Sequence, residues 1–171
     1  MANSAQERVY KKTNEVKFGL VSGPGKGREY NLGAGDYWAR RGGKFVAINV
    51  RGNATAIASS NYAVFGWAEV ETKDSAATYP AILTSKGDRA YVIYANEDNM
   101  FEMPVIQADA SLGASVVGRG CGITYSGTGY GKVQKAIPFG SSAASPLIIV
   151  DYNVRNKTVI VRRRTSPPVV A

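Results

Sequence analysis

The sequence predicts an all-β protein, folded as a single β-barrel or β-sandwich of roughly eight to ten short antiparallel strands. Short runs of β-branched and aromatic residues recur along the chain, and residues that favour turns separate them. The chain contains 19 glycines and 10 tyrosines, a composition that favours strands and turns over helices. No segment shows a sustained helical spacing of apolar residues.

The clearest strands form a hairpin near the end of the sequence. Residues 147–150 and 158–161 are β-branched apolar runs, and the polar segment 151–157 between them contains turn-forming Asp and Asn residues. An isolated hairpin is only marginally stable in water, so this one is expected to lie within a larger sheet.

The chain is divided into an N-terminal arm at residues 1–15, a β-domain at 16–164 and a C-terminal tail at 165–171. The arm is polar, and the two consecutive prolines of the tail cannot continue a strand. Further strands are predicted at 16–21, 44–50, 55–59, 62–70, 90–94, 100–106 and 132–137. Gly66 indicates a bulge, and Pro104 indicates an edge strand or a bulge.

The composition argues against an enzyme and against a bound cofactor or metal ion. Histidine is absent, which removes the commonest general base and the commonest zinc ligand. Cys121 is the only cysteine, so it has neither a disulfide partner in the chain nor a histidine to activate it. The glycine-rich segment 22–28 fits a P-loop neither in spacing nor in the residue after Lys26, so we expect a surface loop there.

The formal net charge of +8 favours an anionic partner. The basic residues gather in small clusters, and one tryptophan lies close to one of them. The candidate partner-binding residues are Lys11, Lys12, Trp38, Arg40, Arg41, Arg162, Arg163 and Arg164. No apolar run approaches the roughly 20 residues of a membrane span, and the first residues lack the apolar run of a signal peptide. We therefore expect synthesis in a cytoplasm and no membrane contact.

Several features of the second half occur together. They are a Gly-Trp-Ala-Glu stretch within 62–70, the run MFEMPVI at 100–106, the sequence VGRG at 117–120 and the hairpin LIIVDYN…VIVRR. Over residues 60–164 the chain resembles the small β-barrel decoration, or cement, proteins bound outside the capsids of tailed bacteriophages. The resemblance implies a virion structural protein, without catalytic activity, that is made in the host cytoplasm and stabilises the assembled major capsid protein as a homo-oligomer, a dimer or a trimer.

An OB-like barrel that binds single-stranded nucleic acid is the alternative function. The net charge and the interleaving of Tyr, Trp and Arg suggest it, and such binding weakens steeply as salt rises. Acidic residues mixed among the basic ones argue against it. The sequence therefore favours the decoration protein, with nucleic acid as the alternative partner and an enzyme as the third hypothesis.

Overall fold

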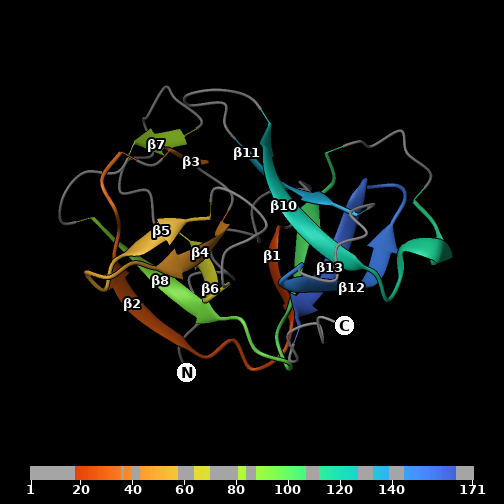
Figure 1. Ribbon diagram of the computed structural model, residues 1–171, viewed down its shortest axis with the longest axis horizontal. Helices are drawn as coiled ribbons and strands as arrows, with labels where there is room; N and C mark the ends of the chain where they lie inside the picture. Colours follow the sequence, from red (N-terminus) through yellow and green to blue (C-terminus); the bar gives the residue numbers. More distant parts are fainter. Residues whose placement is uncertain are drawn as a thin grey trace, which may run out of the picture.

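The structure is a computed structural model that describes residues 18–35, 37–39, 43–57, 64–69, 81–83, 88–106, 112–126, 133–138 and 145–164, with the backbone alone described in 37–39 and 81–83. Within these residues the fold is all-β, with thirteen strands and one short 3₁₀ helix, Ala114–Val116 (Figure 1). The predicted all-β class of short antiparallel strands is confirmed. The predicted arm at 1–15 and tail at 165–171 lie outside the described residues.

The strands form two antiparallel sheets and a separate two-stranded ribbon. In sheet order, the larger sheet contains β1 (Gly19–Ser22), β9 (Met100–Pro104), β13 (Thr158–Arg163), β12 (Leu147–Asn153), β10 (Gly120–Ser126) and β11 (Val133–Ile137). The other contains β2 (Gly27–Asn31), β8 (Arg89–Tyr94), β6 (Gly66–Glu69), β4 (Lys44–Ile48) and β5 (Ala54–Ala56). The ribbon pairs β3 (Tyr37–Ala39) with β7 (Ala81–Leu83).

Each sheet curls until two of its strands meet at a parallel bridge. Leu32, directly after β2, bridges Ala54 of β5, and Val105, directly after β9, bridges Ala136 of β11. We call β2-β8-β6-β4-β5 the first barrel and β9-β13-β12-β10-β11 the second barrel; they lie on the left and the right of Figure 1. Strand β1 precedes the first barrel in sequence but pairs with β9 of the second.

The two barrels repeat one another in strand order. If the five strands of each barrel are numbered 1 to 5 in sequence order, their order in the sheet is 1-5-4-2-3 in both barrels. The bridge then joins the first strand to the third. The pairing register repeats as well, and it places two rows of three paired residues at equivalent positions on the two barrels. They are the first outer row, Phe45–Trp67–Ile93, and the second outer row, Gly120–Ile148–Arg162.

Three backbone hydrogen bonds outside the ladders support this equivalence, because each recurs at the corresponding place. The Leu32 N–H donates to the Asp88 carbonyl (2.8 Å) in the first barrel, as the Val105 N–H does to the Lys157 carbonyl (3.1 Å) in the second. In the same way, the Gly33 N–H donates to the Ala54 carbonyl (2.9 Å) and the Ile106 N–H to the Ala136 carbonyl (3.0 Å). The third pair is Ala95 N–H to Phe65 carbonyl (3.0 Å) and Arg164 N–H to Pro146 carbonyl (2.9 Å). The fold is therefore a structural repeat of a five-stranded barrel.

The two barrels have different interiors. Small or medium-sized residues fill the first: Leu32, Val46, Ala54, Ala68, Ala90 and Val92. Larger residues predominate in the second: Phe101, Met103, Val105, Val116, Cys121, Ile123, Ala136, Leu147, Ile149, Val159 and Val161. The second cluster also includes the first outer row, so one continuous apolar core joins the two barrels.

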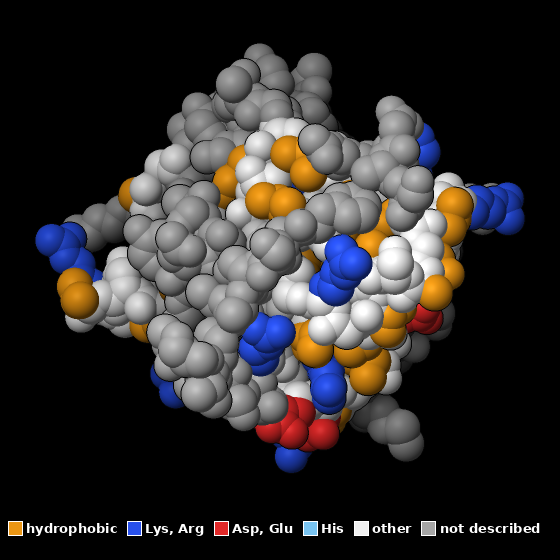
Figure 2. Space-filling view, turned by 45° about the vertical axis from the view of Figure 1, so that its right-hand side comes forward, with side chains coloured by type: hydrophobic (Ala, Val, Ile, Leu, Met, Phe, Trp, Pro, Cys, Tyr) orange, Lys and Arg blue, Asp and Glu red, His pale blue; other side chains and the backbone are white. Residues whose placement is uncertain are grey.

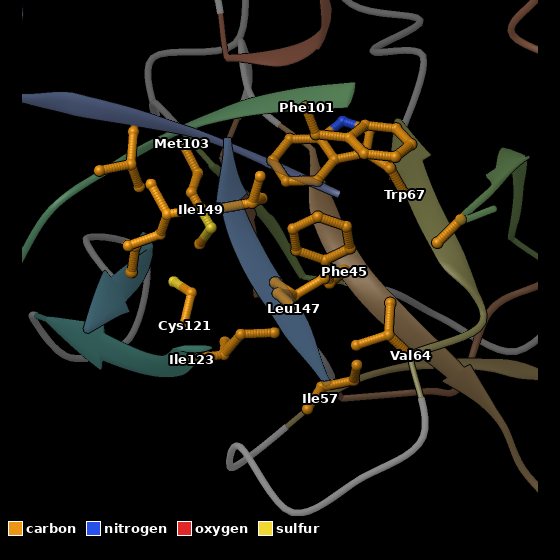
Figure 3. Close-up of a cluster of buried hydrophobic side chains, with 14 of the residues drawn as sticks. Phe45, Ile57, Val64, Trp67, Phe101, Met103, Cys121, Ile123, Leu147 and Ile149 are labelled. Atoms are coloured by element: carbon orange, nitrogen blue, oxygen red, sulfur yellow. The ribbon is translucent and has the colours of Figure 1, made fainter. Parts of the chain in front are cut away.

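The first outer row closes one end of the second barrel (Figure 3). Phe101 points into that barrel, and the Phe45 ring meets it edge-on with the centroids 5.3 Å apart. The Trp67 ring stacks on Phe101 at 5.9 Å. Phe45, Trp67 and Ile93 are at most 3% exposed, so burial of this row contributes strongly to stability.

Polar contacts reinforce the same junction. The Phe45 N–H donates to Gln134 Oε1 at 2.7 Å, and Gln134 Nε2 donates to the Phe45 carbonyl at 3.2 Å. Gln134 Nε2 also donates to the Tyr125 hydroxyl at 3.1 Å, and Lys44 Nζ lies 5.2 Å from the Tyr125 ring centroid. One side chain of the second barrel thus pairs with both backbone groups of Phe45 in a buried position, and the Phe45 carbonyl also accepts from the Ile57 N–H at 3.2 Å.

The structure confirms the predicted hairpin, as β12 and β13, and corrects two details. The bulge predicted at Gly66 is wrong, because Gly66 pairs in unbroken register with Val46 and Tyr94. The glycine instead permits close approach, since a Cβ there would lie 2.4 Å from the Ile93 carbonyl oxygen. Pro104, predicted at an edge strand or a bulge, lies in β9, which is between β1 and β13. The pairing of β9 with β1 ends at Glu102, so Pro104 loses no ladder hydrogen bond on the β1 side.

The described residues contain more strands than predicted, chiefly because β2 and the β3–β7 ribbon lie in segments assigned to no strand or to an ambiguous one. Within the described residues, no helix has the length and apolarity required to cross a membrane.

Candidate binding surfaces

Most of the predicted partner-binding residues cannot be placed. Lys11, Lys12, Arg40 and Arg41 lie outside the described residues. The backbone of Trp38 lies in β3 opposite Ile82, and its side chain lies outside the description. Only the three C-terminal arginines have a described environment.

These three arginines do not form one basic patch, because consecutive side chains of a strand point to opposite faces. Arg162 belongs to the second outer row, and its Nε atom is buried without a hydrogen-bond partner. Arg163 points the other way, and its Nη1 atom donates to the Ala95 carbonyl of the first barrel at 3.4 Å. The Arg164 N–H donates to the Pro146 carbonyl at the end of the hairpin.

Arg162 lies on a face of mixed character, on which Asp151 and Glu102 flank Ile160. Its cross-strand neighbours are Ile148 of β12 and Met100 of β9, and Ile160 follows on the same side of β13. The side chains of Arg162 and of these three residues are partly exposed. Figure 2, which brings the second barrel forward, shows hydrophobic side chains beside isolated Lys and Arg side chains on this side of the molecule. We call Met100, Ile148, Ile160 and Arg162 the outer face of the second barrel.

A second exposed feature is the turn between β12 and β13. Val154 is 60% exposed at its tip, and Arg155 is exposed beside it. Two hydrogen bonds hold the turn: the Asn156 N–H donates to Asn153 Oδ1 at 3.0 Å, and the Lys157 N–H donates to the Val154 carbonyl at 3.3 Å. The turn therefore presents a valine and a cation on a fixed backbone.

A third feature is the end of the first barrel that corresponds to the closed end of the second. Val50, in the turn between β4 and β5, is 104% exposed. Tyr30, Phe65 and Tyr94 are partly exposed and pack edge-to-face, with centroids 5.4 Å apart for Tyr30–Phe65 and 5.6 Å for Phe65–Tyr94. The exposed Arg28 guanidinium lies 4.8 Å from the Tyr30 centroid. We call these residues the free end of the first barrel.

The environment of Cys121 does not suit a nucleophile. Cys121 is fully buried, its Sγ donates to the Gly122 carbonyl at 3.3 Å, and burial raises the pKa of its thiol to about 12. Such a thiol stays protonated and inaccessible. Among the described residues, no group of three or more His, Cys, Asp or Glu side chains is placed so that it could hold a metal ion.

Neither Val50 nor Val154 was predicted as a surface residue, because the strand predicted at 44–50 includes Val50 and the segment 151–157 was assigned only as a turn. The available signal was an apolar residue followed by arginine within a polar turn, as in Val50-Arg51 and Val154-Arg155. Comparison of this chain with protein-family models, with curated proteins and with solved structures finds no match.

Proposed function

We propose that this protein is a capsid decoration protein, a non-enzymatic virion component that binds and stabilises an assembled shell of major capsid protein. The all-β fold and the surfaces described above support this proposal. A ligand that binds only the assembled shell favours assembly by mass action, and many identical sites multiply a weak contact.

The observation that carries the proposal is the exposed turn of Val154 and Arg155. It projects from the hairpin of β12 and β13, on the side of the second barrel opposite the end that the first outer row closes. Val154 suits a shallow apolar recess, and Arg155 suits a carboxylate beside it, with bidentate geometry available. The hydrogen-bonded turn limits the conformational entropy lost on binding.

Cosedimentation with capsid shells of the phage that encodes the chain tests the proposal. We expect the intact protein to sediment with shells, and the double variant Val154→Asp with Arg155→Glu to lose at least tenfold in affinity. Arg89→Glu, which changes an exposed arginine on the other barrel, should bind normally. Absence of the protein from purified virions by mass spectrometry, together with no shell binding, would refute the proposal.

A nucleic-acid-binding barrel is the second candidate, favoured by the five-stranded barrels, since the OB fold is a five-stranded barrel that binds oligonucleotides. The surface favours it less. Tyr91, at 44%, is the most exposed aromatic side chain within the described residues, and it pairs across the strands with Glu29 and Glu69. Carboxylates on both sides oppose a phosphate backbone.

Fluorescence anisotropy with a labelled single-stranded oligonucleotide separates the two functions. The decoration protein should show no saturable binding at low salt. Binding that weakens steeply with rising salt, and that Tyr91→Ala reduces, would instead establish the nucleic-acid function.

A further inference from the structure

We propose that this chain assembles head to tail with further copies of itself, through the outer face of the second barrel and the free end of the first barrel of the next copy. The inference rests on the structural repeat and does not depend on the proposed function.

The repeat supplies the geometric argument. Within one chain, the first outer row closes an end of the second barrel. The equivalent row on the second barrel is Gly120–Ile148–Arg162, and the equivalent end of the first barrel is its free end. The described residues therefore contain one contact of this type that is made and both halves of a second that is not.

Exposure distinguishes the two contacts. Phe45, Trp67 and Ile93 are at most 3% exposed, whereas in the second outer row Gly120 is buried but Ile148 and Arg162 remain partly exposed. At the receiving end, Val50 occupies the position equivalent to Tyr125, which in the second barrel lies against Gln134 and Lys44. Val50 has no such cover, at 104% exposed. Large apolar residues left on both halves fit a further protein contact.

The residue sizes at the equivalent positions are complementary. Where Phe45 meets Phe101 inside one chain, the positions on the second contact hold Gly120 and Arg28. A residue without a side chain thus faces a long one, in place of two facing rings.

The same equivalence gives Arg162 a partner. Tyr94 on the first barrel is at the position equivalent to Arg163 on the second. Within one chain, the Arg163 guanidinium donates to the Ala95 carbonyl across the contact between the barrels. Ala95 is in turn equivalent to Arg164, so Tyr94 of one copy is brought to the end of β13 of the next. There its ring and hydroxyl can receive the Arg162 guanidinium, whose Nε atom is buried and unpaired in the single chain.

The two halves of the contact are different surfaces, so the interface is heterologous. Such an interface produces a closed ring when the rotation between copies closes, and a filament when it does not. In both cases the average mass in solution rises above that of the monomer as the protein concentration rises.

Sedimentation velocity of the full chain over a concentration series at moderate salt provides the first test. We expect the mass to rise above that of a monomer. Val50→Asp changes the free end, Ile148→Lys and Arg162→Glu each change the outer face, and all three should remain monomeric while circular dichroism shows the intact fold. Tyr91→Asp, on another face of the first barrel, should assemble as the unmodified protein does.

Mixing two variants provides the decisive test. Val50→Asp retains an intact outer face, and Ile148→Lys retains an intact free end, so a mixture should form a one-to-one pair that grows no further. A monomer at every concentration would overturn the proposal. Assembly that survives Val50→Asp, or that mixing fails to restore as a pair, would show a different interface and would also overturn it.

Discussion

The two barrels share a backbone plan but differ in what fills them. In the first, the buried residues are alanines, valines and Leu32, and an aromatic group of Tyr30, Phe65 and Tyr94 packs at its free end. In the second, the interior holds Phe101, and residues of the first barrel close the equivalent end. Strand order and register therefore do not determine the size of the core residues, which differs between a barrel end covered by other residues and one left exposed.

Substitutions at equivalent positions of the two outer rows test the difference between the barrels most strongly. Trp67→Ala removes a buried ring at the junction, so we expect a loss of about 3–5 kcal/mol in unfolding free energy. Ile148→Ala at the equivalent, partly exposed position should cost roughly 1 kcal/mol. Urea unfolding in dilute solution measures both, and equal losses would contradict the difference in burial.

Gln134 tests whether polar contacts hold the barrels together. Gln134→Met keeps the volume but leaves the buried Phe45 N–H without this acceptor, while the Phe45 carbonyl still accepts from the Ile57 N–H, so we expect a loss of roughly 1–3 kcal/mol. Lys135→Met on the neighbouring, partly exposed position is the matched control and should change stability by less than about 0.5 kcal/mol. If the two variants unfold alike, the side-chain clamp contributes little.

Cys121 and Val46 occupy equivalent interior positions. Replacing Cys121 by valine is therefore expected to have the smallest effect on stability near neutral pH. Cys121→Val should change stability near neutral pH by less than about 1.5 kcal/mol. Burial raises the pKa of the folded thiol to about 12, whereas the unfolded thiol ionises near pH 8.5. The unmodified protein should therefore lose about 1.4 kcal/mol per pH unit relative to the variant as pH rises between these values.

Thermal unfolding at pH 7, 9 and 10 measures that difference. A gap between the two proteins that stays constant over this range would show that the thiol ionises as readily in the folded chain as in the unfolded one.

The sequence predicted the fold class and the strands with the clearest alternation, such as β8 and the hairpin of β12 and β13. It did not predict the repeat, because equivalent positions hold residues as different as Phe45 and Gly120, or Trp67 and Ile148. The equivalence lies in backbone pairing, which many side chains satisfy equally well.

The surface was predicted less well than the fold. Arg162, Arg163 and Arg164 were all candidate partner-binding residues, but strand geometry sends Arg162 and Arg163 to opposite sides of β13. The exposed turn at Val154 was assigned only a connecting role, because the composition of a turn does not reveal how far it projects. Surface function depends on which distant strands become neighbours, and local patterns do not contain that information.

The position of β1 has a consequence for the order of folding during synthesis. Strand β1 leaves the ribosome before the whole first barrel, yet its partner β9 follows that barrel in the chain. The first barrel is therefore complete in sequence before β1 has anything to pair with. Its folding brings the ends of the intervening segment together, since Ser22 and Met100 are direct partners. The first barrel thus acts as an internal template that removes most of the loop-closure entropy for the strand that begins the second.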